Sequence, residues 1–68
     1  MYESGKVLQH DADFDDAIIH RLPIKIVQSE TGEVLDNRAY IGEHTEDAVV
    51  LLSDGNAYLK STNDFVVI

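Results

Sequence analysis

The chain has 68 residues, no cysteine and a formal net charge of −8, with 13 Asp and Glu against five Lys and Arg. This charge repels nucleic acid and anionic membranes, and the lack of cysteine excludes disulfides and thiolate metal sites. A chain this short forms one domain, residues 1–68, with a small core and little room for an enclosed active site. Without a membrane-length apolar run or signal-peptide pattern, it is expected to be a soluble, cytoplasmic protein and not an enzyme.

The segment "KVLQH" has short strand character, and the acidic segment "DADFDDAIIHRLP" follows it. Asp11 can cap a helix here, negative charge favours the first turn, and Pro23 prevents continuation. We predict a short helix from about Ala12 to Arg21. The alternative is a strand, because adjacent isoleucines favour one. The helix prediction uses apolar residues that recur at helical spacing: Phe14, Ala17, Ile18 and Leu22.

After Pro23 the pattern becomes that of β-strands. "IKIVQ" alternates in polarity, "SETGEV" supplies a turn, and "RAYIGE", "AVVLL", "AYLK" and "FVVI" are further candidate strands. The Asp-Gly pair in "SDGN" predicts a hairpin between residues 48–52 and 57–60. We predict an α+β, mainly β fold: a small antiparallel sheet of four to six short strands with one short N-terminal helix. The alternative is an all-β SH3-like barrel.

The aspartate run also suggests a calcium loop. "DADFDD" places carboxylates at positions 1, 3 and 5, as an EF-hand does, but Asp16 stands where glycine is needed and Leu22 where a glutamate is needed. The three histidines, His10, His20 and His44, are scattered along the chain. We therefore expect no metal and no other cofactor, and a metal-dependent regulator is the least favoured class. The sequence contains neither a nucleophile motif nor a phosphate-binding motif, so no pattern in it indicates catalysis.

Acidic residues form three clusters: Asp11, Asp13, Asp15 and Asp16; Glu30, Glu33 and Asp36; Glu43, Glu46 and Asp47. If the clusters project from one edge, they present spaced negative charges as a phosphate backbone does. Such an edge attracts a basic DNA-binding surface, and the attraction weakens with salt. The alternative is a set of solvated loops whose charge keeps a small domain soluble. The sequence leaves the oligomeric state open.

Several short motifs occur in an order that suggests a family. "ESGKVL" comes first, Asp15 and Asp16 then precede "AIIHRLP", and "AYIGEHTEDAVVLLSDGNAY" follows. Together they resemble the phage uracil-DNA glycosylase inhibitors. The resemblance implies an antiparallel α/β inhibitor that mimics DNA and occupies the DNA-binding groove of the enzyme. It also implies that Asp16 or Asp15 is the leading carboxylate and that Val50 and Leu52 contribute to an apolar pocket. After Pro23 the family has an acidic helix, whereas this chain has a strand pattern.

Charge and resemblance together predict an acidic inhibitor that mimics DNA, binds a protein with a basic DNA-binding surface, and binds neither nucleic acid nor membrane. The alternative is a small structural or assembly module of the SH3-like kind with no inhibitory role. The expected partner-binding residues are Asp13, Asp15, Asp16, Glu43, Glu46, Asp47, Val50 and Leu52.

Overall fold

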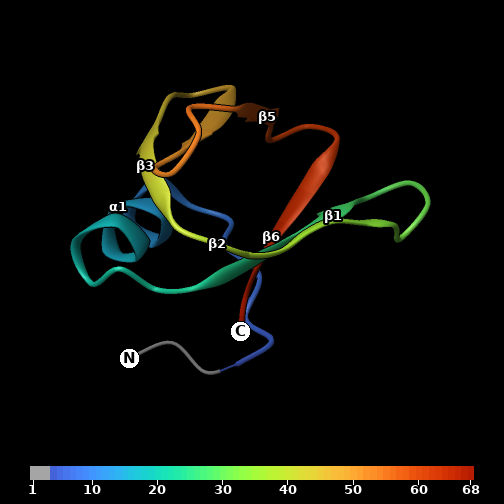
Figure 1. Cartoon of the computed structure of the whole chain (residues 1–68), viewed down its shortest axis with the longest axis horizontal. Coiled ribbons are helices and arrows are strands. Elements are labelled where there is room, and N and C mark those ends of the chain that lie inside the picture. Colours follow the sequence, from blue (N-terminus) through green and yellow to red (C-terminus); the bar gives the residue numbers. More distant parts are fainter. Residues whose placement is uncertain (1–3) are drawn as a thin grey trace.

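A computed structural model describes residues 4–68 of the chain as one helix and six strands (Figure 1). The elements are α1 (Asp11–Ile19), β1 (Ile24–Gln28), β2 (Val34–Ala39), β3 (Ile41–His44), β4 (Ala48–Leu51), β5 (Ala57–Leu59) and β6 (Asn63–Val67). Every strand pairing is antiparallel, so the predicted α+β, mainly β fold is confirmed. Within these residues, no helix has the length and apolar character that crossing a membrane requires.

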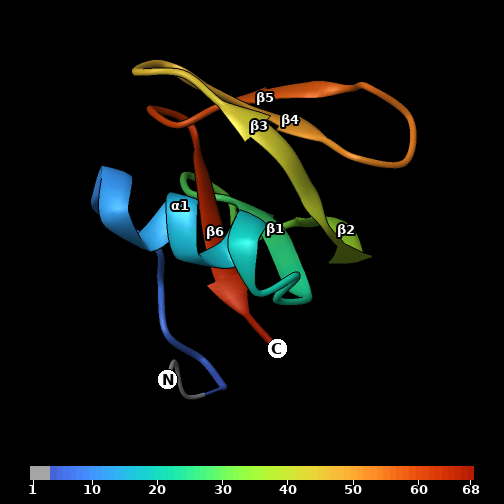
Figure 2. The same ribbon diagram turned by 90° about the vertical axis from the view of Figure 1, so that its left-hand side faces the viewer.

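The strands form two three-stranded sheets, in the orders β2-β1-β6 and β3-β4-β5. The chain passes between them at Tyr40, because Ala39 pairs with β1 whereas Ile41 pairs with β4. A single strand over "RAYIGE" is therefore wrong: the two sheets run across each other, and the chain must bend to enter the second (Figure 2). The presence of α1 makes the fold α+β rather than all-β.

Helix α1 confirms the predicted helix and excludes the strand alternative, although its bounds are Asp11–Ile19 rather than Ala12 to Arg21. Its end is closed by two backbone bonds, from Leu22 N–H to Ala17 C=O at 3.0 Å and from Arg21 N–H to Ile18 C=O at 3.3 Å. This pair of bonds is a Schellman motif. Arg21 occupies its left-handed position with φ 50°, so it cannot continue the helix.

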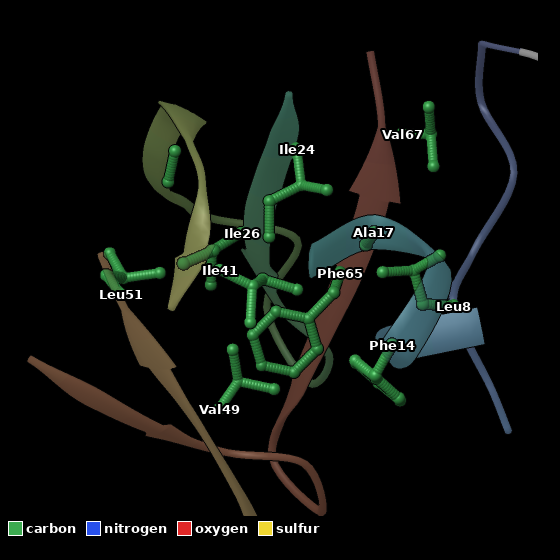
Figure 3. Packing of buried hydrophobic residues seen from close by; sticks show 11 residues of the cluster. Leu8, Phe14, Ala17, Ile24, Ile26, Ile41, Val49, Leu51, Phe65 and Val67 are labelled. Atoms are coloured by element: carbon green, nitrogen blue, oxygen red, sulfur yellow. The ribbon is translucent and has the colours of Figure 1, made fainter. Parts of the chain in front are cut away.

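The core lies between the two sheets and α1 (Figure 3). Alternate residues of β1 and β4 point into it, as expected for half-buried strands. The buried residues are Leu8, Phe14, Ala17, Ile24, Ile26, Ala39, Ile41, Val49, Leu51, Phe65 and Val67. Leu8 comes from "KVLQH", which is not a strand: it forms one bridge, Val7 to Val66, and lies along the edge of β6.

The predicted hairpin is confirmed, with Val49 opposite Tyr58 and Gly55 in the left-handed region at φ 71°. The final strand begins and ends earlier than "FVVI", at Asn63 and Val67. A second glycine is needed for a different reason. A Cβ on Gly42 would lie 3.1 Å from Leu52 Cα and 3.3 Å from Leu52 N, so any larger residue would force the two backbone segments apart.

We predict that Gly42→Ala lowers the free energy of unfolding by about 1–3 kcal/mol, because the added methyl group overpacks this contact. Urea denaturation measures the loss. As a control, Gly42→Ala is also made in a chain that carries Leu52→Ala, because the contact involves the Leu52 backbone and not its side chain. The loss should therefore persist in the double variant, and its disappearance there would contradict the structure.

The C-terminal end of α1 requires a positive φ at residue 21. Glycine adopts a positive φ without steric cost, whereas an alanine at residue 21 meets the same strain as arginine. Arg21→Gly should therefore be more stable than Arg21→Ala by about 1 kcal/mol. Both variants remove the same cation, so thermal unfolding of the pair isolates the backbone effect. Equal stability would show that the Schellman motif does not close this helix.

Candidate functional site

Asp13 stabilises the start of α1 from a buried position. Its carboxylate accepts hydrogen bonds from Gln9 N–H at 3.0 Å and from His10 N–H at 3.1 Å. His10 is the N-cap residue, so the expectation that Asp11 caps the helix is wrong. The exposed fraction of Asp13 is only 9%. Asp13 was expected to bind a partner, but in the structure its carboxylate stabilises the start of α1.

Asp11 and Asp15 lie on a different side of α1 from Asp13. They are four residues apart, which places them one above the other on the helix surface. The Asp15 carboxylate contacts His44 Nε2 at 2.7 Å, and Asp11 Oδ1 lies 3.9 Å from Lys60 Nζ. Both carboxylates are largely exposed, whereas Asp16 is half-buried. Asp15 is therefore the more accessible of the two carboxylates that the resemblance singles out.

The β3–β4 turn carries two more acids to the same place. Thr45 shapes this turn: its hydroxyl accepts from Ala48 N–H at 3.1 Å, and its N–H donates to Ala48 C=O at 2.8 Å. Glu46 and Asp47 at the tip are exposed. Figure 2 shows this turn, the start of α1 and the chain between β5 and β6 on the same side of the molecule.

Lys60 connects these segments. Its backbone N–H donates to Asp47 C=O at 2.8 Å, and its ammonium donates to Thr45 C=O in the β3–β4 turn. The ammonium also lies 4.2 Å from the centre of the Phe14 ring, close enough for a cation–π interaction. These contacts hold α1 and the turn together, so four exposed carboxylates share one edge. We call this set, Asp11, Asp15, Glu46 and Asp47, the acidic edge.

An exposed apolar surface adjoins the acidic edge. Val50 and Leu52 point away from the core because they alternate with the buried Val49 and Leu51. The cross-strand pairs Val50–Ala57 and Ala48–Leu59 place β5 side chains beside them. Leu52 and Leu59 are 56% and 53% exposed, respectively. We call this surface of the second sheet the outer face; its residues are Ala48, Val50, Leu52, Ala57 and Leu59.

Glu43 lies beside the outer face, opposite Val50. The remaining acidic cluster lies elsewhere. Glu30 and Glu33 are in the β1–β2 connection, which projects from the end of the molecule opposite α1 (Figure 1). The first and third sequence clusters therefore come together in the fold, and the second does not.

Three residues of this region were not predicted as part of a site: His44, Lys60 and Leu59. The alternation of Ala57, Tyr58 and Leu59 in a short strand carries a signal for Leu59. His44 and Lys60 are 16 residues apart, and no spacing rule connects them. Across residues 4–68, no three His, Asp or Glu side chains converge closely enough to hold a metal ion.

Comparison with known proteins adds no relative: the chain matches no protein-family model, no curated protein and no solved structure.

The role of Asp13 is directly testable. Asp13→Ala leaves the Gln9 and His10 N–H groups without this acceptor and should cost about 1–2 kcal/mol of stability. Asp13→Asn retains an acceptor oxygen and should cost less than half as much. Chemical denaturation of both variants gives the comparison. A stable alanine variant would show that the carboxylate does not stabilise the start of α1.

Proposed function

We propose that this chain is an acidic, phage-type inhibitor that mimics DNA and blocks a DNA-binding protein. The observation that carries the proposal is the acidic edge itself, because the contacts of Lys60 bring α1 and the β3–β4 turn, each with two exposed carboxylates, to one edge. Carboxylates repeated along an edge offer a basic groove the charge that it receives from phosphates. The partner is therefore a protein whose DNA-binding surface is rich in Lys and Arg.

The charge of the chain also favours binding to a basic protein. The chain carries a net charge of −8, which attracts a basic partner over distance and speeds association. Lys60, the cation nearest the acidic edge, is turned inward; its side chain is only 17% exposed and already contacts Thr45 and Phe14. It therefore presents little positive charge to a partner. We place the action in the cytoplasm, since a chain without cysteine suits a reducing compartment.

The outer face provides an apolar contact surface, which the acidic residues alone do not provide. Protein interfaces combine an apolar centre with a polar rim, and most of their affinity comes from a few buried contacts. Leu52 and Leu59 are exposed on the same sheet whose β3–β4 turn carries Glu46 and Asp47. Burial of these leucines on binding gives affinity, while the neighbouring acids select basic surfaces.

Uracil-DNA glycosylase is the specific candidate partner, from the motif order described above. The fold departs from that family where the sequence does, because β1 follows Pro23 in place of a helix. The candidate therefore depends on the acids and motif order. A uracil-excision assay decides it: inhibition should rise with added chain, and full activity at excess chain would remove this enzyme as the partner.

A second candidate function is a small assembly module without inhibitory activity, which the exposed outer face favours. Its contact would be mainly apolar and little affected by salt, whereas binding by a DNA mimic should weaken about tenfold or more between about 50 and about 200 mM salt. Partner binding at these two salt concentrations separates the two functions.

The acidic edge predicts a difference between two variants of equal net charge. Glu46→Gln/Asp47→Asn removes two charges from the edge, and Glu30→Gln/Glu33→Gln removes two from the opposite end. With an oligolysine peptide as the probe, the first variant should bind about three- to tenfold more weakly than the second, since each exposed ion pair contributes up to about 1 kcal/mol. Calorimetry at low salt measures both. Equal weakening would mean that net charge matters and the edge does not.

A further inference from the structure

Asp15 of the acidic edge is the exposed end of a row of three side chains, and the other two, His44 and Lys60, are mostly buried. The Asp15 carboxylate contacts His44 Nε2 at 2.7 Å, and Lys60 Nζ lies 3.1 Å from His44 Nδ1. The exposed fractions of the His44 and Lys60 side chains are only 12% and 17%. The Phe14 ring stacks on the imidazole, with 5.4 Å between ring centres. The row therefore joins α1, β3 and the segment after β5.

The geometry determines which atoms of this row carry protons. An ammonium group has only donors, so His44 Nδ1 must accept the hydrogen bond from Lys60. A carboxylate has only acceptors, so His44 Nε2 must carry a proton and donate it to Asp15. Both conditions hold for one form of histidine alone, the neutral imidazole with its proton on Nε2.

Adding a proton to Nδ1 would replace this hydrogen bond with repulsion between two donors. The charged groups that contact His44 are Asp15 on α1 and Lys60 after β5, and Asp11 on α1 lies 3.9 Å from Lys60 Nζ. On β4, the residue paired with His44 is the buried, apolar Val49. On β3, the neighbouring acid Glu43 is exposed and lies opposite Val50. Lys60 is the member of the row that can turn away, because its charge is at the end of a side chain with several rotatable bonds.

We propose that Asp15, His44 and Lys60 form a proton-sensitive latch that regulates the acidic edge. A proton taken up from solvent at His44 Nδ1 displaces the Lys60 ammonium from His44 and from Thr45 C=O. The imidazolium keeps its bond to Asp15, and the released ammonium turns outward between Asp11 and the β3–β4 turn. The edge thus gains one charge from the proton and exposes a second on Lys60.

The consequence for binding rests on the proposed function. With the latch open, two positive charges lie among the four carboxylates, and the attraction for a basic partner falls. Because the open state holds one more proton than the closed state, acidification favours the open latch. The structural change itself does not depend on any partner.

NMR of the whole chain tests the latch without a ligand. At about pH 8, the ¹⁵N shifts of His44 should show the neutral form protonated on Nε2. As His44 takes up its second proton, the Glu46 amide, which follows the Thr45 carbonyl, should shift in step. In Lys60→Met, which keeps a long apolar side chain, this linked shift should disappear. A neutral His44 protonated on Nδ1, or a Glu46 shift that persists in Lys60→Met, would overturn the proposal.

Binding of an oligolysine peptide tests the consequence. The wild-type chain should bind about fivefold more weakly at about pH 5.5 than at about pH 8, as expected for one added charge beside the edge. His44→Gln keeps a side chain that can donate to Asp15 but does not titrate, and most of the pH dependence should vanish. His20→Gln, at an exposed histidine outside the row, is the matched control and should retain it.

The outcomes separate the two proposals. If the peptide fails to bind at any pH, the proposed function fails, and the NMR experiment alone decides the latch. If the peptide binds but His44→Gln keeps the full pH dependence of the wild-type chain, the latch is wrong and the acidic edge stands.

Discussion

The position of Phe14 determines how helix and sheets fit together. Its ring packs edge-on against Phe65 at 5.8 Å, stacks on His44 and lies beneath the Lys60 ammonium. One side chain of α1 thus contacts β6, β3 and the segment after β5. A chain of 68 residues has few apolar side chains to bury, so a ring with three aromatic or cationic neighbours is a large part of what holds its helix.

The burial of Phe14 also determines the direction in which the neighbouring aspartates point. With that face of the helix turned inward, Asp13 is directed to the backbone N–H groups of the helix start. Asp11 and Asp15 are directed to the edge where the β3–β4 turn arrives. The dense acidic run therefore has two roles: one carboxylate stabilises the helix, and others form a charged surface. The first role does not reduce the second, because different residues perform them.

The sequence predicted most of the fold because local signals decided it. Apolar spacing and Pro23 marked the helix, and alternation and the Asp54–Gly55 turn marked the strands. Two features depended on tertiary contacts. Tyr40 interrupts an apparent single strand only because two sheets cross there. Asp13, and not Asp11, stabilises the helix start, since the carboxylate of a third helical residue can reach back to the preceding N–H groups.

The candidate site was less predictable than the fold. Charge showed that acids would dominate the surface, and alternation gives Val50 and Leu52 an exposed side. Which acidic clusters meet was not predictable, since it depends on the position of the helix relative to the β3–β4 turn. His44 and Lys60 have no sequence signal of their own, because they come together only when β3 and the segment after β5 both pack against α1.

We propose that the edge formed by α1 and the β3–β4 turn is the binding surface. Amide chemical-shift mapping with an oligolysine peptide, and with uracil-DNA glycosylase, tests it most directly. The largest changes should occur at residues 11–15 and 46–52, with little change at residues 29–33. Changes centred on the β1–β2 connection, or spread evenly over all exposed acids, would contradict it.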